Sequence, residues 1–263
     1  MKKLCAYCDG DGPFTREHVW PDAFLERFGR SGAGFSVRSQ RVHKAEYAVR
    51  DVCSKCNNKH LSQLDTYFVG LYDKYFAHIT GLRATITFEY EYDLLARALL
   101  KIAYNSARIG LGDDGTLRKT NKYILGTTSR RPEGMVIVAE LVAPYKKMVD
   151  NLTSIEIPPN MFHSAKVELK IPSRLKVLTR LITVNSYFFF LTIPKAVYSS
   201  VELQSIKNEC TNLIPGTVYV SEARKSIKLN TSPQDGVRLF LPQIMANREK
   251  YRTYFNKRKS DAT

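Results

Sequence analysis

Tryptophan, histidine, cysteine and long apolar runs are all scarce in this chain. Its 263 residues include one Trp, five His and five Cys. The strongest apolar run, YFFFLTI at residues 187–193, is far shorter than the roughly eighteen residues that a membrane helix needs, and suits a buried strand. The first residues, MKKLCAYC, lack the apolar segment of a secretory signal. We therefore expect a soluble, cytoplasmic protein.

Acidic residues are also in short supply. The chain has 25 Asp and Glu against 40 Lys and Arg, a net charge of +15. Residues 1–92 carry 13 Lys and Arg against 11 Asp and Glu, whereas residues 93–263 carry 27 against 14. An excess this large favours a polyanionic partner, and a cytoplasmic location makes DNA a better candidate than a membrane surface, with RNA left open. The alternative is a basic surface without a partner.

Hydrophobic periodicity predicts an α+β protein that divides near residue 90. Residues 1–90 are rich in loops and contain a helix that starts at Asn57, and residues 83–92 alternate like a strand. Residues 93–110 form an amphipathic helix, with Asp93 as its expected N-cap and Gly110 just past its end. We expect a first domain over residues 1–90 and a basic α+β domain over residues 91–263.

Several shorter elements are predicted in the second domain. The apolar pattern predicts strands at residues 135–143, 165–171, 176–184, 187–194 and 217–222. Asn185 and Ser186 form the expected hairpin turn between two of them. The run VELQSIKNEC resembles a helix and makes Cys210 a core residue. The basic groups expected to contact phosphate are Arg130, Arg131, Lys146, Lys147 and the arm at residues 248–259, although each by itself is more often a solvated group.

Four of the five cysteines form two close pairs, Cys5-x-x-Cys8 and Cys53-x-x-Cys56. Four thiolates on two such turns are the ligand set of a closed structural zinc site. Disulfides are disfavoured in a reducing compartment, and the alternative of buried or redox-active cysteines lacks a thioredoxin-like context. We expect zinc to support a first domain whose own core is thin.

The complete pattern is C-x-x-C, then Glu17-His18-Val19 with Pro21, then C-x-x-C followed by Asn57. It resembles the HNH endonuclease family, whose ββα-metal (His-Me finger) fold carries such zinc-binding turns. The resemblance covers residues 5–70 and is similar to stand-alone bacterial members. It implies a metal-dependent endonuclease that hydrolyses phosphodiester bonds in DNA.

The resemblance assigns a role to each matching residue. Glu17 and Asn57 are the implied ligands of a catalytic Mg²⁺ or Mn²⁺, and His18 is the implied general base. His60, where many members have lysine, is implied to join the metal or contact phosphate, or else it is a surface histidine. Independent chemistry agrees, because phosphodiester hydrolysis needs an activated water and a cation, and Glu and Asn offer hard oxygen ligands.

One position departs from the family pattern. The middle Asn of the motif, which orients the general base, corresponds to Ala48 here. Asp65 is either an outer group of the metal site or a solvated carboxylate. Trp20 and Phe24 are expected to pack in the core around the hairpin.

Two other functions stay open beside the nuclease. One is a zinc-stabilised nucleic-acid-binding or adaptor module with a degenerate nuclease site. The other is a sensor or effector whose second domain binds a small signal or a partner. Resemblance to HNH proteins of this size suggests restriction or anti-phage defence as the setting.

Overall fold

A computed structural model describes residues 3–29, 33–36, 41–44, 48–109, 114–148, 154–157, 159, 162–169, 171–212 and 216–232. It confirms a mixed α+β fold, built on a seven-stranded mixed sheet with six α-helices in the described ranges. Within those ranges, no helix is both long enough and apolar enough to cross a membrane.

The large sheet has the strand order β5-β13-β6-β11-β10-β9, and β12 also pairs with β6. Neighbouring strands run antiparallel, except that β13 is parallel to β6. The bounds of these strands are β5 Thr85–Glu89, β6 Val136–Val142, β9 Phe162–Val167, β10 Val177–Val184, β11 Tyr187–Pro194, β12 Val218–Tyr219 and β13 Ser226–Ser232.

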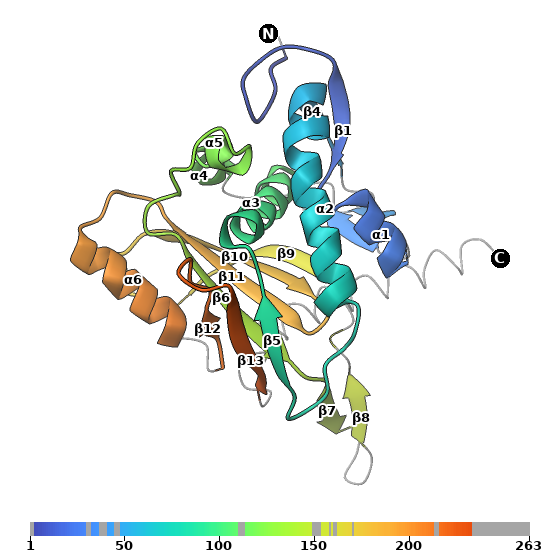
Figure 1. Cartoon of the computed structure of the whole chain (residues 1–263), viewed down its shortest axis with the longest axis vertical. Helices are drawn as coiled ribbons and strands as arrows, with labels where there is room; N and C mark the ends of the chain where they lie inside the picture. Colours follow the sequence, from blue (N-terminus) through green and yellow to red (C-terminus); the bar gives the residue numbers. More distant parts are fainter. Residues whose placement is uncertain are drawn as a thin grey trace, which may run out of the picture.

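Two helical segments cover one face of this sheet. One is continuous from Cys56 to Phe76, through the π-helical segment η1 Cys56–Leu61, α2 Ser62–Leu71 and the π-helical segment η2 Tyr72–Phe76. The other is α3, Tyr92–Ile109. Figure 1 shows both in front of the sheet, with α3 over β10 and β11. Because side chains alternate along a strand, Phe189 and Leu191 of β11 face these helices.

The other face of the sheet packs against α6, Ser200–Asn212. Phe188 and Phe190 of β11 belong to this second cluster, together with Ile206 and Cys210 of the helix. Cys210 is 1% exposed, so its predicted place in the core is confirmed.

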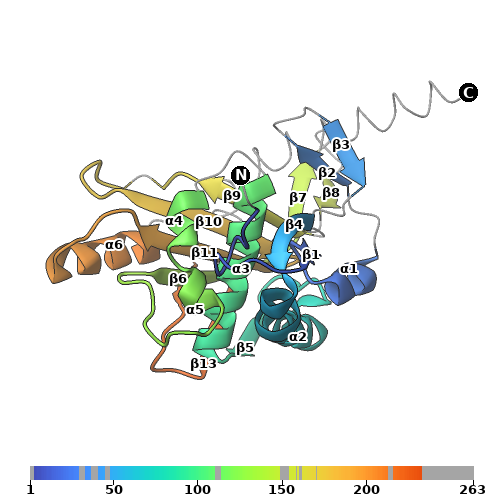
Figure 2. The same cartoon turned by 90° about the horizontal axis from the view of Figure 1, so that it is seen from above.

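The remaining elements are short. Strand β1 Phe14–His18 pairs with β4 Ala48–Cys53, β2 Ala33–Ser36 pairs with β3 Arg41–Lys44, and β7 Tyr145–Met148 pairs with β8 Ser154–Ile157. The other helices are α1 Asp22–Phe28, α4 Asp114–Arg118 and α5 Asn121–Ile124. Figure 2 shows α1 and the β1/β4 hairpin on the same side of the molecule as α2.

Most of the strong apolar patterns are confirmed as elements. The predicted strands at 135–143, 176–184 and 187–194 are β6, β10 and β11, and Asn185 and Ser186 form the turn between the last two, with Asn185 at φ 48°. The predicted strand at 83–92 is shorter, because α3 begins at Tyr92. The segment at 217–222 pairs only over Val218–Tyr219.

Some predicted boundaries are wrong. The strand expected at 165–171 runs instead from Phe162 to Val167, because its pairing with β10 sets its ends. Asp93 is not the N-cap of α3, since it lies inside the first turn, where its carboxylate accepts hydrogen bonds from Tyr123 Oη (2.6 Å) and Arg131 Nε (2.8 Å). Strand β13 was not predicted, although Ile227 and Leu229 alternate with polar residues. Gly110 and the basic arm at 248–259 lie outside the described residues.

The division at residue 90 stays a prediction. The hydrophobic core is continuous across it, because β5 joins β13 of the large sheet, and Phe76 packs on Tyr187 with ring centroids 4.8 Å apart. The expected core roles of Trp20 and Phe24 are confirmed, at 5% and 0% exposed.

Candidate functional site: a four-cysteine cluster and the hairpin it supports

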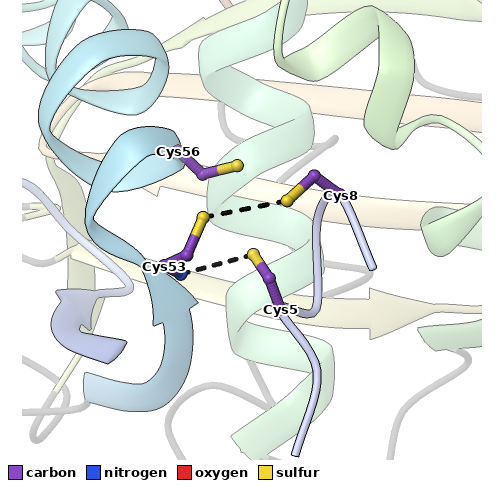
Figure 3. A group of neighbouring side chains, drawn as sticks. All are labelled: Cys5, Cys8, Cys53 and Cys56. Carbon is purple, nitrogen blue, oxygen red and sulfur yellow. Dashed lines mark hydrogen bonds between the residues drawn. The ribbon is translucent and has the colours of Figure 1, made fainter. Parts of the chain in front are cut away.

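Four cysteine side chains from two distant parts of the sequence meet beside α3. Cys5 and Cys8 lie on the loop before β1, Cys53 ends β4, and Cys56 begins η1 (Figure 3). Their sulfur atoms all lie within 4.8 Å of one another, and Cys8 Sγ is 3.7 Å from Cys53 Sγ. A tetrahedral zinc with bonds of about 2.3 Å separates its sulfur ligands by about 3.8 Å. The cluster therefore fits a structural zinc ion.

The surroundings of the cluster favour a cation. Burial opposes ionisation of Cys5, but backbone N–H groups, including that of Cys53 at 3.3 Å, outweigh it and lower the Cys5 pKa to about 7. Burial raises the pKa of Cys8 and of Cys56, and nearby sulfurs raise the Cys56 pKa further. Four crowded sulfurs, one of them a ready thiolate, suit Zn²⁺, which binds thiolates.

The cysteine cluster holds together the β1/β4 hairpin and the helix that follows it. Thr15 of β1 pairs with Val52, whereas Glu17 pairs with Val49, so β4 carries an extra residue opposite Arg16. Arg16 is exposed, Glu17 is buried and His18 is half-buried. The hairpin therefore points Glu17 inward and leaves His18 partly open to solvent.

Glu17 is enclosed by charged groups that sequence reasoning missed. Its carboxylate is 2.7 Å from the ammonium of Lys101 on α3, and Lys101 also forms an ion pair with Asp65 of α2. Glu17 is 2% exposed and Lys101 is 1% exposed. Burial disfavours the Lys101 charge, but Asp65 and Glu17 outweigh it and raise the Lys101 pKa. Burial also raises the Glu17 pKa, and Lys101 opposes this rise.

A second residue of α3, Asn105, contacts the same part of β1. Its Nδ2 donates to Glu17 Oε1 (3.2 Å) and to the backbone carbonyl of His18 (3.3 Å). Its Oδ1 accepts from Tyr7 Oη (2.8 Å) and Arg108 Nη1 (3.1 Å). With both ends of the amide bonded and no exposure, the Asn105 side chain has one orientation. The amphipathic pattern of α3 indicated a buried face, but gave no sign that polar residues on it would reach β1.

Asn57 and His60 lie in η1, after the last cysteine. Asn57 Nδ2 donates to Thr15 Oγ1 (2.9 Å) and to the Arg16 carbonyl (3.0 Å), which ties the start of the helix to β1. Asn57 and His60 are both half-buried. Asp65, by contrast, is neither solvated nor free, because it belongs to the ion pair with Lys101.

The described part of the chain contains one group of His, Cys, Asp or Glu side chains close enough to hold a metal, and that group is the four cysteines. Ala48 lies directly opposite His18 in the hairpin. Among the expected phosphate contacts, Arg131 is engaged by Asp93 and Glu222, while Arg130 is exposed. Both arginines line an open pocket of about 570 Å³, in which Glu133 and Glu222 balance their charge.

Comparison of the chain with models of protein families, with curated proteins and with solved structures gives no match in any of the three. What this site does is therefore argued from its own geometry.

Proposed function

We propose that the protein is a metal-dependent endonuclease of the HNH type, acting on DNA, with a structural zinc at its cysteine cluster. Its support is an arrangement of two antiparallel strands followed by a helix, joined at the four cysteines. His18 ends the first strand, Asn57 opens the helix, and the net charge of the chain is +15.

The observation that carries the proposal is the bond from Asn105 to the carbonyl of His18. The resemblance expects a middle Asn to orient the general base through its backbone, and the matching position is Ala48. In this chain an Asn from α3 reaches the same backbone from another element. A purely structural zinc hairpin has no need for an amide held in one orientation against the histidine.

His18 has the chemistry of a general base, because imidazole accepts a proton near neutral pH. A divalent ion, when bound, would neutralise charge on the leaving oxygen. Asn57 fits such an ion, since its Nδ2 is used within the hairpin and its Oδ1 has no partner among the described residues. Glu17 does not fit it in this arrangement, because its carboxylate is buried against Lys101.

The deciding experiment is incubation of the purified protein with plasmid and Mg²⁺ or Mn²⁺. We expect the wild type to nick the plasmid and His18→Ala to lose about 10²–10⁴ in rate while it keeps its zinc and its DNA affinity. Exposed His78 provides the matched control, and His78→Ala is expected to match the wild type. Nicking by His18→Ala at the wild-type rate would refute the mechanism.

Asn105→Ala tests positioning separately from catalysis. We expect kcat to fall while KM stays close to the wild-type value, because substrate contacts are retained and only the orientation of His18 is lost. Asn105→Asp, which keeps an acceptor but loses the amide donor, should behave like Asn105→Ala. Unchanged kcat in both variants would remove the role of Asn105.

A second candidate function is a zinc-stabilised nucleic-acid-binding or adaptor module. The observation that favours it is the pairing of Glu17 with Lys101, which places an ammonium where the resemblance implies a metal. This function predicts a wild type that binds DNA and is inert with every divalent ion.

A further inference from the structure

Arg180 is a buried cation without an acidic partner. It lies on β10, is 4% exposed, and its guanidinium donates through Nη2 to Ser106 Oγ of α3 and to Ser164 Oγ of β9 (3.4 Å). Its Nε has no hydrogen-bond partner, and no carboxylate of the described residues pairs with it. Burial lowers its pKa to about 10. A buried charge with no counter-charge costs stability, so a fold that keeps one has a use for it.

A second cation lies directly opposite the first. Lys166 of β9 is the register partner of Arg180, and it is exposed. Like charges at paired positions of neighbouring strands destabilise a sheet. The next acidic residue along the chain, Glu168, is exposed and forms no ion pair with either cation in the described structure. Two neighbouring strands therefore present positive charge together, without compensation.

Two hydroxyl groups complete the cluster. Ser106 Oγ and Ser164 Oγ lie 2.8 Å apart, both beside the guanidinium, and both residues are half-buried. Hydroxyls rotate to donate where a ligand accepts, and a guanidinium offers several donors to an oxyanion. A guanidinium, an ammonium and two hydroxyls are together a donor set for a phosphate group.

This cluster lies close to the hairpin. Ser106 directly follows Asn105, which bonds the His18 carbonyl. Phe162, at the start of β9, packs on Trp20 with ring centroids 5.3 Å apart, so β9 itself reaches the end of the hairpin. A nucleic-acid strand bound at His18 would pass the exposed side of β9.

We infer that Arg180, Lys166, Ser106 and Ser164 bind a backbone phosphate of a polynucleotide beside the hairpin. The polynucleotide as the source of the phosphate rests on the proposed function. Binding of a phosphate group at this cluster does not depend on whether the hairpin cleaves DNA.

The test measures duplex affinity by fluorescence anisotropy, with the full chain and no added divalent ion. Arg180→Met is expected to weaken binding about tenfold or more, and to lower the slope of log K against log salt by about one. Lys166→Met, at an exposed position, should weaken binding severalfold without affecting folding.

Thermal unfolding separates binding from structure. Without a ligand, Arg180→Met should be at least as stable as the wild type, because the variant removes an unpaired buried charge. Arg97→Met is the matched control, since burial also lowers the pKa of Arg97 and its Nε donates to the Ile124 carbonyl (2.9 Å). The control should lose stability and keep its DNA affinity.

Three ligands identify the source of the phosphate: inorganic phosphate, a mononucleotide and a duplex oligonucleotide. We expect the duplex to raise the melting temperature of the wild type most, and to raise that of Arg180→Met less. Duplex affinity unchanged in both Arg180→Met and Lys166→Met overturns the inference, as does a response to inorganic phosphate alone. If the wild type binds duplex through Arg180 but never nicks plasmid, the nuclease proposal fails and this inference stands.

Discussion

Lys101 connects three elements through one side chain. Its ammonium lies between Glu17 of β1 and Asp65 of α2, while its own backbone belongs to α3. Two carboxylates share one cation, so the group carries a net negative charge in the interior of the protein. Removing the cation leaves both carboxylates uncompensated, and that loss is costly where water is excluded.

Lys101→Met is therefore expected to lower the free energy of unfolding by about 3–5 kcal/mol. Urea denaturation followed by circular dichroism measures the change. The control is Lys74→Met, which breaks an exposed pair with Glu89 and should leave stability unchanged. Equal stability of the two variants would show that the buried ion pair contributes nothing.

His163 gives the protein a sensitivity to acid. Burial, followed by the charge of Arg180, lowers its pKa from 6.5 to about 4. Between these values the unfolded chain binds a proton that the folded chain excludes, so stability falls as pH falls from about 6.5 to about 4. We expect this loss to be about 1–3 kcal/mol and to be reduced in His163→Gln. Melting temperatures across this range, with His78→Gln as the exposed control, measure it; identical curves for the wild type and His163→Gln would contradict it.

At the scale of elements, the zinc cluster closes a loop between the N-terminal segment and the start of a helix. The hairpin has little apolar area of its own, since the burial of β1 is limited to Glu17 and that of β4 to Val52 and Cys53. A metal that links Cys5 and Cys8 to Cys53 and Cys56 supplies the stability that packing does not.

We expect one zinc ion per chain by elemental analysis, and loss of the folded hairpin when a chelator removes it. Cys53→Ser should lower both the zinc content and the solubility. Cys210→Ala, at a buried cysteine outside the cluster, should keep one zinc ion. Folded wild-type protein without zinc would disprove the site.

At the scale of the whole molecule, the hairpin and the large sheet share one core. Phe76, at the end of the long helix, packs on Phe88 of β5 and on Tyr187 and Phe189 of β11. These contacts join residues on both sides of the expected boundary at residue 90. The packing of α2 on α3 adds to the same core.

Phe76→Ala is expected to cost about 3–5 kcal/mol, because it opens a cavity at this junction. A shared core further predicts that the hairpin and the sheet lose structure in one transition, which calorimetry measures. Phe14, a half-buried residue of β1, provides a milder comparison as Phe14→Ala. Two separate transitions in the wild type would support independent domains instead.

Local patterns in the sequence were enough to predict the elements with strong signals. The two Cys-x-x-Cys pairs predicted the cluster, because ligand spacing on a tight turn is a local property. The strands β6, β10 and β11 and the helix α3 followed from apolar periodicity, which depends only on neighbouring residues. Weak alternation, as in β13, was not enough to predict a strand.

What only the tertiary structure decided is which polar residues meet. Glu17, Lys101 and Asp65 are separated by dozens of residues, and so are Arg180, Ser106 and Ser164. Periodicity marks a position as buried, but it does not say which partner lies across the interface, because that depends on how α3 is placed between the hairpin and the sheet. The sequence by itself determined the zinc ligands and the main elements. The docking of α3 decided that Glu17 is paired, that Asn105 holds His18, and that Arg180 is buried without a counter-charge.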